Sequence, residues 1–477
     1  MTVTTPKTAD VALTIGARLV IEPGYPAAVH DAVRRRFTLD NPAYAEAKRF
    51  DHDTRGIPAH LLYYDERPDG ALVVPRGALE LVYRDCRVLG LESSWVDETH
   101  IADPVAFKER VTLSEAQERA VGQVLTRRVG VLESPAGSGK TIMAMALIAR
   151  RRQRALIIVH TKELAHQAIA RAVAVLGLDE EEIGLVGDGQ CTIGARLTVA
   201  LVQSLTRYIP PALRDVSHVI VDECHHVPAE QMAAVVSQFP ARYLCGLTAT
   251  PYRRDGLDAV IGFYLGPTVA RIAKEDLADR LICPRVLKRD TGLCVVGDSF
   301  TEIVGQLVVD DARNCLIVAD VVGAVAAGRR CLVLSDRVGH VEELVVMLRV
   351  AGVAAAALHG RLPRRERAAV VEDLAAGDLA VVVATGSLVG EGFDCPQLDT
   401  LFIATPVSYA GRVVQYLGRV SRTAPGKADA MVYDYCDDHP MLWASYRNRK
   451  TVYMKQACPI DAGGDAGGRG SWQRRSA

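Results

Sequence analysis

Short apolar runs alternate with helical segments over residues 130–250. The runs are rich in β-branched residues, and the segments between them, such as TIMAMALIARR and KELAHQAIARAVAVLG, have apolar positions at helical spacing. Uniformly apolar strands joined by helices indicate a parallel sheet that is covered on both faces. We therefore predict strands within GVLESPAGSGK, ALIIVHT, LTVALVQS, HVIVDE and YLCGLTAT.

The same alternation returns in the C-terminal half of the chain, after a connecting stretch near residues 262–300. Its apolar runs are CLVLSD, VAAAALHG, LAVVVAT, TLFIAT and AMVYDY, and helical segments such as GHVEELVVMLRVAG separate them. Two similar arrays in tandem predict an α/β protein with two doubly wound parallel-sheet domains and a cleft between them.

The two ends of the chain have a different character. The N-terminal segment mixes short strands such as HLLYYDE and ALVVPRG with helices such as NPAYAEAKRF, which predicts a small α+β domain. The C-terminal end is basic, rich in glycine and nearly without β-branched residues, which predicts a disordered tail that is solvated or contacts phosphate nonspecifically. The expected segments are an N-terminal domain over 1–105, doubly wound domains over 106–275 and 276–456, and a tail over 457–477.

The overall composition sets few limits on the partners of this protein. Lysine and arginine number 56 against 57 aspartate and glutamate residues, a net charge of -1, so any basic surface must be local. No apolar run is long enough to cross a membrane and the N-terminus lacks a signal sequence, so we expect a cytoplasmic protein without a membrane partner. The 11 cysteines form no C-x-x-C pair, which argues against structural zinc.

A glycine-rich segment, SPAGSGKT at residues 134–141, stands between an apolar run and a helical segment. This is the setting of a P-loop, in which backbone amides and a helix N-terminus close on the phosphates of a nucleotide. Lys140 is expected to reach the β- and γ-phosphates, and the Thr141 hydroxyl to ligate magnesium. The predicted cofactors are therefore ATP and Mg²⁺, and the predicted binding residues are Pro135, Ala136, Gly137, Ser138, Gly139, Lys140 and Thr141.

A pair of carboxylates follows the apolar strand HVIV. At the carboxyl end of a neighbouring strand, Asp222 can hold the magnesium ion and Glu223 can act as the base toward the attacking water. Cys224 and His225 follow directly, but no second ligand pair stands at metal spacing, so a zinc site is not expected.

The chain resembles the superfamily 2 helicases and translocases, whose motifs occur in the same order over about residues 109–455. ALIIVHTKELAHQ resembles motif Ia, TVALVQSL motif Ic and LTATP motif III. The resemblance implies a RecA-like fold for both doubly wound domains, and it implies that Thr248 and Thr250 of motif III couple hydrolysis to movement. It further implies that the nucleic-acid backbone is gripped at His160, Thr161, Gln203 and Ser204; capping of strand ends is the alternative for these residues.

Two further motifs lie in the second array. The segment from ATG to GEGFD resembles motif V, and QYLGRVSR resembles motif VI. Arg419 and Arg422, three residues apart, are expected to share a helical face and to act as arginine fingers on the γ-phosphate. Gln415 is expected to position the water or to sense the γ-phosphate. The resemblance also implies nucleic-acid contacts at Thr385 and Gly386 and nucleotide contacts at Gly392 and Asp394.

Upstream of the P-loop, TLSEAQ resembles the family segment whose glutamine reads the adenine edge. The resemblance assigns that role to Gln117. Ser114 stands where the family usually has arginine, so the match is partial, and a glutamine on a helix surface is the alternative.

The segments TATPYRRDGLD and LHGRLPRRER are most similar to the XPB-like group, which includes phage branch-migration helicases and helicases of bacterial defence loci. In those proteins a small DNA-engaging domain precedes the motor, which residues 1–105 resemble; a domain that only supports the motor is the alternative. We predict an ATP-dependent DNA helicase or translocase acting on duplex or branched DNA in repair, recombination or defence. An ATP-gated DNA-binding subunit that recruits a separate nuclease without unwinding, and an RNA remodeller, are the competing hypotheses.

Overall fold

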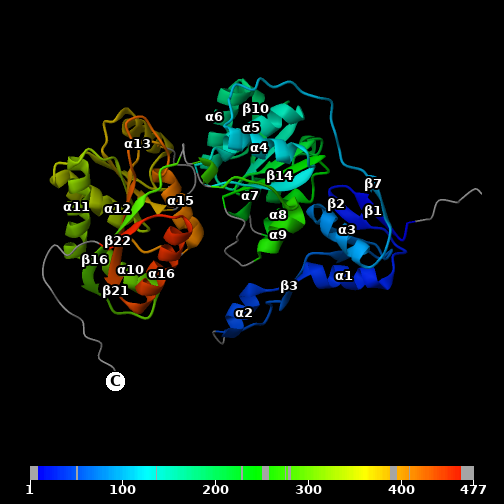
Figure 1. The fold of residues 1–477 in the computed structure, drawn as a ribbon, viewed down its shortest axis with the longest axis horizontal. Helices are drawn as coiled ribbons and strands as arrows, with labels where there is room; N and C mark the ends of the chain where they lie inside the picture. Colours follow the sequence, from blue (N-terminus) through cyan, green and yellow to red (C-terminus); the bar gives the residue numbers. More distant parts are fainter. Residues whose placement is uncertain are drawn as a thin grey trace, which may run out of the picture. The chain divides into compact units, whose positions relative to one another are not determined.

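The structure is a computed structural model that describes residues 9–49, 52–135, 137–226, 229–249, 257–273, 275–277, 281–386, 395–407 and 409–462. The chain forms two compact units, Met1–Asp276 and Leu277–Ala477, and Figure 1 labels the elements for which there is room. The division lies one residue beyond the expected end of the first doubly wound domain. Each unit contains a largely parallel sheet, so the predicted α/β class is confirmed.

The N-terminal part of the first unit is a small α+β fold. A five-stranded sheet has the order β5-β6-β2-β1-β7, in which β1 and β7 are parallel and the other neighbours antiparallel. Val11, Leu13 and Ile15 are buried because their alternation places all three on the core side of β1. The elements are β1 (Val11–Ile15), β2 (Arg18–Ile21), α1 (Ala27–Phe37), β3 (Thr38–Asp40), α2 (Pro42–Arg49), β4 (His60–Leu62), β5 (Asp65–Glu66), β6 (Leu72–Pro75), α3 (Leu79–Val88) and β7 (Ser93–Asp97).

This N-terminal fold shares its hydrophobic core with the first doubly wound fold. Phe37 packs against Phe263 with ring centroids 4.9 Å apart, and one buried cluster contains side chains from both parts. A Cβ on Gly77 would lie 2.4 Å from the Gly266 backbone nitrogen. Arg76, which is buried, donates hydrogen bonds to the carbonyl oxygens of Gly16 and Ala241. Residues 1–105 were expected to be a separate domain, and the structure instead joins them to the first unit through a continuous core.

The first doubly wound fold contains an eight-stranded sheet. Its order is β11-β10-β12-β9-β13-β14-β8-β15, and every neighbouring pair is parallel except β10 and β11. The carboxyl ends of β8, β13 and β14 therefore meet at one edge of the sheet. The strands are β8 (Val129–Glu133), β9 (Ala155–Val159), β10 (Ile183–Gly187), β11 (Gln190–Cys191), β12 (Leu197–Leu201), β13 (His218–Val221), β14 (Tyr243–Thr248) and β15 (Thr268–Arg271); the helices are α4 (Glu115–Leu125), α5 (Lys140–Arg151), α6 (Lys162–Leu176), α7 (Val202–Arg207), α8 (Ala229–Val236) and α9 (Asp258–Leu265).

The second unit contains a seven-stranded parallel sheet in the order β18-β19-β17-β20-β21-β16-β22. Two buried clusters cover its two faces: α11 and α12 contribute to one, and α13, α15 and α16 to the other (Figure 1). The strands are β16 (Arg285–Cys294), β17 (Cys331–Ser335), β18 (Ala355–Leu358), β19 (Val381–Thr385), β20 (Thr400–Ile403), β21 (Met431–Asp438) and β22 (Ile460–Ala462); the helices are α10 (Phe300–Val308), α11 (Asp311–Ala326), α12 (Val338–Val350), α13 (Arg364–Ala376), α15 (Ala410–Val420) and α16 (Pro440–Lys455).

The start of the expected C-terminal tail belongs to this sheet. Ile460 pairs with Val286 and Asp461 with Leu287, so β22 extends the sheet beside β16. The boundary expected at residue 457 was therefore wrong for residues 457–462, because a short strand can be stabilised by a neighbour that is distant in sequence. The remainder of the expected tail lies outside the described residues. The connecting stretch expected near 262–300 likewise contains a strand, β16.

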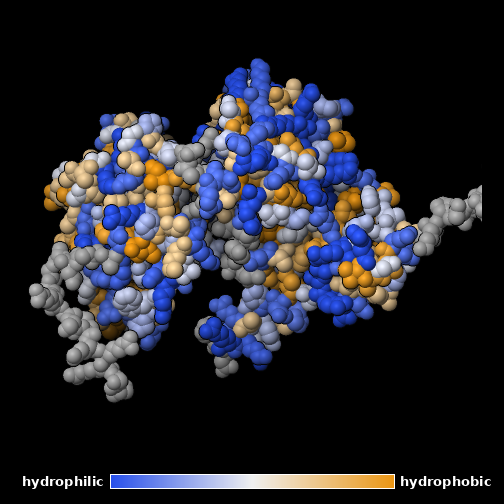
Figure 2. Space-filling view, viewed as in Figure 1, coloured by the Kyte–Doolittle hydropathy of each residue, from blue (hydrophilic) through white to orange (hydrophobic). Residues whose placement is uncertain are grey.

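Hydrophobic residues are scattered among hydrophilic ones on the face of the protein drawn in Figure 2. Within the described part of the chain, none of the helices combines the length and hydrophobicity that a membrane crossing needs.

Candidate active site

The glycine-rich loop joins β8 to α5 at the carboxyl edge of the first sheet. Gly137 and Gly139 have φ angles of 83° and 85°, a left-handed conformation that glycine adopts without strain and that turns the loop into the start of α5. The Ser134 and Ser138 hydroxyls lie 2.5 Å apart, which closes the loop. Lys140 is the first residue of α5, and its side chain is only 9% exposed.

The two predicted carboxylates follow β13 and face this loop. Lys140 Nζ lies 3.2 Å from Glu223 Oε1 and 3.4 Å from the Ser134 carbonyl oxygen. Asp222 is buried and accepts a hydrogen bond from the Glu223 amide at 2.9 Å. Burial and the negative charge of Glu223 raise the pKa of Asp222 to about 6. The buried Asp222 and the partly buried Glu223 thus share one lysine as their counter-charge.

This donor set fits a magnesium ion. Mg²⁺ prefers hard oxygen ligands and is commonly held by one or two protein groups together with phosphate oxygens and water. The Asp222 carboxylate and the Thr141 hydroxyl are such ligands, and a cation beside Asp222 would favour its charged form. Among the described residues, no group of three or more His, Cys, Asp and Glu side chains could hold a metal ion by itself.

A short chain of polar contacts connects the carboxylates to the end of β14. His225 Nδ1 lies 3.5 Å from Glu223 Oε2 and forms a hydrogen bond with the Thr248 hydroxyl at 2.8 Å. His225 and Thr248 are both buried. Because β14 lies between β8 and β13 in the sheet, Thr248 is held beside the loop as well, and its carbonyl oxygen accepts from the Ser134 amide at 2.9 Å.

Gln117 lies behind the loop, on α4. Its backbone and side chain form a capping box with Ser114, and its Nε2 donates to the Ser138 carbonyl oxygen at 2.7 Å. A Cβ on Gly139 would lie 2.7 Å from Gln117 Nε2, so the glutamine rests directly against the loop. The structure therefore shows a buried glutamine that supports the P-loop, rather than a glutamine on a helix surface.

The second unit presents motif VI on α15. Gln415 and Tyr416 are buried, and Arg419 is half-buried. Arg422 was expected to share a helical face with Arg419, but α15 ends at Val420 and Arg422 instead forms an isolated β-bridge with Leu281. The expectation was wrong because the helical spacing does not continue through the end of α15.

Two family models match the chain. Residues 110–253 match the family described as "Type III restriction enzyme, res subunit", and residues 313–424 match "Helicase conserved C-terminal domain". The chain belongs to the superfamily 2 helicases. Both domains of an ATP-hydrolysing helicase are thus present.

Curated relatives and a solved structure are similar to this helicase. The DNA 3'-5' translocase XPB2 of Sulfurisphaera tokodaii is 31% identical over 215 residues, 44% of this chain and 48% of the relative; the chain thus spans about half of that relative. The probable helicase D10 of Escherichia phage T5 is 25% identical over 350 residues, 72% of this chain and 76% of the relative. The structure of S. cerevisiae Dbp5 bound to RNA and ADP BeF3 has a TM-score of 0.55 at 15% identity, covering 74% of this chain and 90% of that one, a likeness in fold.

In the first unit, four residues are predicted to contact the nucleic-acid backbone, and they lie close together: His160, Thr161, Gln203 and Ser204. Parallel pairing of β9 with β12 brings the ends of these strands side by side. The Thr161 hydroxyl caps α6 by accepting from the Leu164 amide at 3.3 Å, and Gln203 Nε2 donates to the His160 carbonyl oxygen at 2.9 Å. Ser204 lines a surface pocket of about 410 Å³.

In the second unit, motif V contacts motif VI directly. Thr385 ends β19, and a Cβ on the following Gly386 would lie 2.1 Å from the Tyr416 hydroxyl and 2.9 Å from Asp336 Oδ1. Arg412 of α15 lies 3.8 Å from Asp336 Oδ2. Glycine at this position therefore permits the close packing of β19 against α15.

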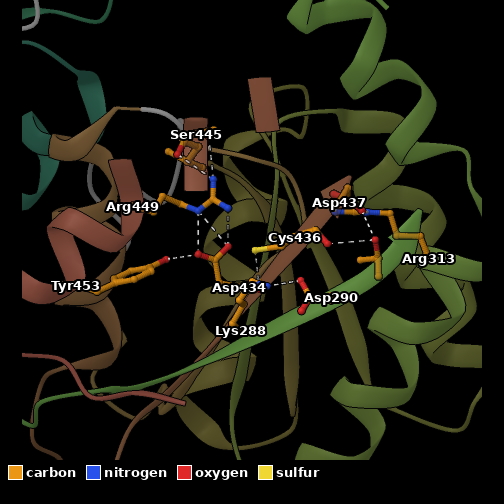
Figure 3. Close-up of polar contacts among 11 residues, drawn as sticks. Lys288, Asp290, Arg313, Asp434, Cys436, Asp437, Ser445, Arg449 and Tyr453 are labelled. Carbon is orange, nitrogen blue, oxygen red and sulfur yellow. Dashed lines mark hydrogen bonds and ion pairs between the residues drawn. The ribbon is translucent and has the colours of Figure 1, made fainter. Parts of the chain in front are cut away.

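A buried polar network behind α15 was not predicted from the sequence. Asp434 of β21 lies between Arg449 and Tyr453 of α16, as Figure 3 shows. Arg449 Nη1 also donates to the Val407 carbonyl oxygen at 3.3 Å, just before α15 begins. The paired residues are distant in sequence, so the available signal was only the unusual run of acidic residues in an otherwise apolar strand, YDYCDD.

Four predicted site residues lie outside the described part of the chain. They are Ala136 of the P-loop, Thr250 of motif III, and Gly392 and Asp394 of motif V.

Proposed function

We propose that this helicase is an ATP-driven DNA translocase that remodels duplex or branched DNA. The main observation that supports this proposal is the chain of contacts from Lys140 through Glu223 and His225 to Thr248, which links the P-loop to the end of β14. A nucleotide phosphate that binds Lys140 would take away the ion-pair partner of Glu223. The contacts of Glu223 with His225, and of His225 with Thr248, can pass this change to the end of β14. The proposal of DNA as the substrate is supported by the relative named as a DNA 3'-5' translocase.

The residues of the first unit have distinct proposed roles. Lys140 leaves Glu223 to bind the β- and γ-phosphates, which frees the Glu223 carboxylate to accept a proton from the attacking water. Asp222 and Thr141 hold magnesium, and a bound magnesium ion neutralises charge on the phosphates. Gln117 supports the loop and is proposed to read the adenine edge, as a residue at this side of the P-loop can.

The second unit is proposed to complete the chemistry and to share the grip on DNA. Arg419 and Arg422 act as arginine fingers that stabilise charge on the γ-phosphate, and Gln415 positions the water. ATP hydrolysis then switches the two units between two arrangements. This change moves their contacts with the nucleic-acid backbone along the strand. The other proposed contacts are with nucleotide at Gly392 and Asp394, and with nucleic acid at Thr385, Gly386, His160, Thr161, Gln203 and Ser204.

The proposal extends to the N-terminal fold and to the biological setting. Because the N-terminal fold shares a core with the first doubly wound fold, DNA bound to the N-terminal fold would be held in a fixed position relative to the P-loop. We place the activity in repair, recombination or defence, with a separate nuclease as a possible partner.

Steady-state ATP hydrolysis with magnesium tests this function. The full chain is compared without effector and with single-stranded DNA, duplex DNA, a four-way junction and single-stranded RNA. Glu223→Gln should lower turnover by about 100-fold or more while leaving DNA binding intact, because general-base catalysis contributes at least this much. Glu180→Gln makes the same chemical change at an exposed position of the first unit and should leave turnover unchanged.

The outcomes separate the competing hypotheses. Strongest stimulation by duplex or branched DNA supports the translocase, whereas stronger stimulation by RNA would assign the protein to RNA remodelling. Hydrolysis and tight DNA binding without strand displacement or translocation would favour a DNA-binding subunit that recruits a nuclease. Normal turnover in the Glu223→Gln protein would refute the catalytic assignments.

A further inference from the structure

A pocket of about 410 Å³ opens at the carboxyl edge of the first sheet, next to α6 and the turn between β10 and β11. Tyr208, which is 60% exposed, forms part of its wall beside Arg207. Ser204, one of the proposed backbone contacts, also lines it. Lys162 and Asp188 bring one charge of each sign into the same wall.

Asp188 is held in this wall by a tight turn. Asp188 and Gly189 have φ angles of 52° and 78°, the left-handed pair that a two-residue hairpin turn requires and that Asp-Gly commonly provides. Asp188 Oδ1 lies 2.7 Å from Lys162 Nζ, and its Oδ2 lies 3.0 Å from His166 Nε2. Lys162 and His166 are four residues apart on α6, so they lie on the same helical face. Each contacts one of the two oxygens of the Asp188 carboxylate.

The Asp188 carboxylate resembles, in its charge and its two oxygens, the phosphodiester that this pocket is proposed to bind. A phosphodiester presents two anionic oxygens, and lysine and histidine are common donors to them. The hydrogen bond from Lys162, followed by that from His166, lowers the pKa of Asp188 to about 2, so the carboxylate is charged at neutral pH. While it holds both donors, a nucleic-acid strand must compete with it for them.

We infer that Asp188 is an internal competitor for the phosphate backbone: it holds Lys162 and His166 until a phosphodiester of the bound strand displaces it. This inference rests on the proposed function. The consequence is weaker binding of the strand at this pocket, since each strand phosphate must replace an existing ion pair instead of meeting unpaired cations. A motor that moves along a strand has to release each backbone contact, and a ready replacement anion favours that release.

The test is a binding titration with the full chain and a fluorescein-labelled oligodeoxythymidine strand, followed by anisotropy at several salt concentrations. Asp188→Asn removes the charge and retains the turn, because asparagine also tolerates a positive φ. The variant should bind about fivefold more tightly at low salt, an effect of the size that one exposed ion pair supports. Its salt dependence should be steeper, because it has no displaced carboxylate that takes up a salt cation when the strand binds. Glu180→Gln, which removes an exposed charge away from the pocket, serves as the matched control and should change the affinity by less than about twofold.

A second set of variants shows whether the effect passes through the two donors. In a Lys162→Gln/His166→Gln background, Asp188→Asn should no longer tighten binding. Tightening that persists in this background, or weaker or unchanged binding of the single Asp188→Asn variant, would overturn the inference. If the unaltered chain binds neither DNA nor RNA strands at low salt, the proposed function itself fails. If it binds and Asp188→Asn has no effect, only the role of Asp188 is lost.

Discussion

Replacing Arg449 by methionine tests how the second unit holds the segment before α15. The Arg449 side chain is 1% exposed and that of Asp434 is 0% exposed. Arg449 Nε lies 3.0 and 2.9 Å from the two Asp434 oxygens, and Nη2 lies 2.8 Å from Oδ1. Methionine fills much of the same space with a flexible chain, so the main loss is the positive charge beside a buried carboxylate.

The size of the effect follows from this burial. In Arg449→Met, Asp434 keeps the Tyr453 hydroxyl as a donor at 2.8 Å but loses its cation. Removing one partner of a buried ion pair costs about 3–5 kcal/mol. Adding Asp434→Asn removes the buried charge as well, so the double variant should be more stable than Arg449→Met alone by about 1–2 kcal/mol.

Urea unfolding followed by the fluorescence of Trp443 gives the measurement. Trp443 lies on α16, between Asp434 and Arg449 in the sequence, and its Nε1 donates to Asp438 at 3.2 Å. Replacing the other two tryptophans, Trp95 and Trp472, by phenylalanine confines the signal to the second unit. A loss below about 0.5 kcal/mol for Arg449→Met, as at an exposed site, or a double variant less stable than the single one, would refute the reasoning.

Two further predictions concern stability. Gly77→Ala should destabilise the first unit by several kcal/mol, because the added Cβ would lie 2.4 Å from the backbone nitrogen of Gly266; a thermal midpoint equal to that of the parent would contradict this packing. Burial, with the nearby Arg313 charge, lowers the pKa of His340 from 6.5 to about 3, so only the unfolded chain gains this proton as the pH falls through that window. The second unit should lose up to about 1.4 kcal/mol per pH unit there, and His340→Gln should flatten the dependence of the urea midpoint on pH.

Much of the candidate site follows from local sequence. The glycines of residues 134–141 permit the loop conformation, and the apolar runs before the loop, before Asp222 and through Leu247 are uniform enough to require buried parallel strands. Parallel strands present their carboxyl ends at one edge, so the sequence by itself determined that Lys140, Asp222, Glu223 and Thr248 lie at one edge of the first sheet.

Other features were decided only by tertiary structure. The pairing of β1 with β7, the addition of β22 to the sheet and the continuous core between the N-terminal fold and the first doubly wound fold all join segments that are distant in sequence. Their local patterns are short, so partners elsewhere in the chain determine whether they become strands.

The charged residues show the same limit most clearly. Arg449, Asp434 and Asp188 are residue types that are usually solvated, and nothing in their local sequence shows which partner each one meets. A charged side chain can be buried only where a partner within hydrogen-bond distance offsets the cost of removing it from water. The sequence by itself therefore determined that the residues proposed for nucleotide chemistry lie at one sheet edge, and the tertiary structure decided which charges pair beneath the segment before α15 and which cations Asp188 meets beside α6.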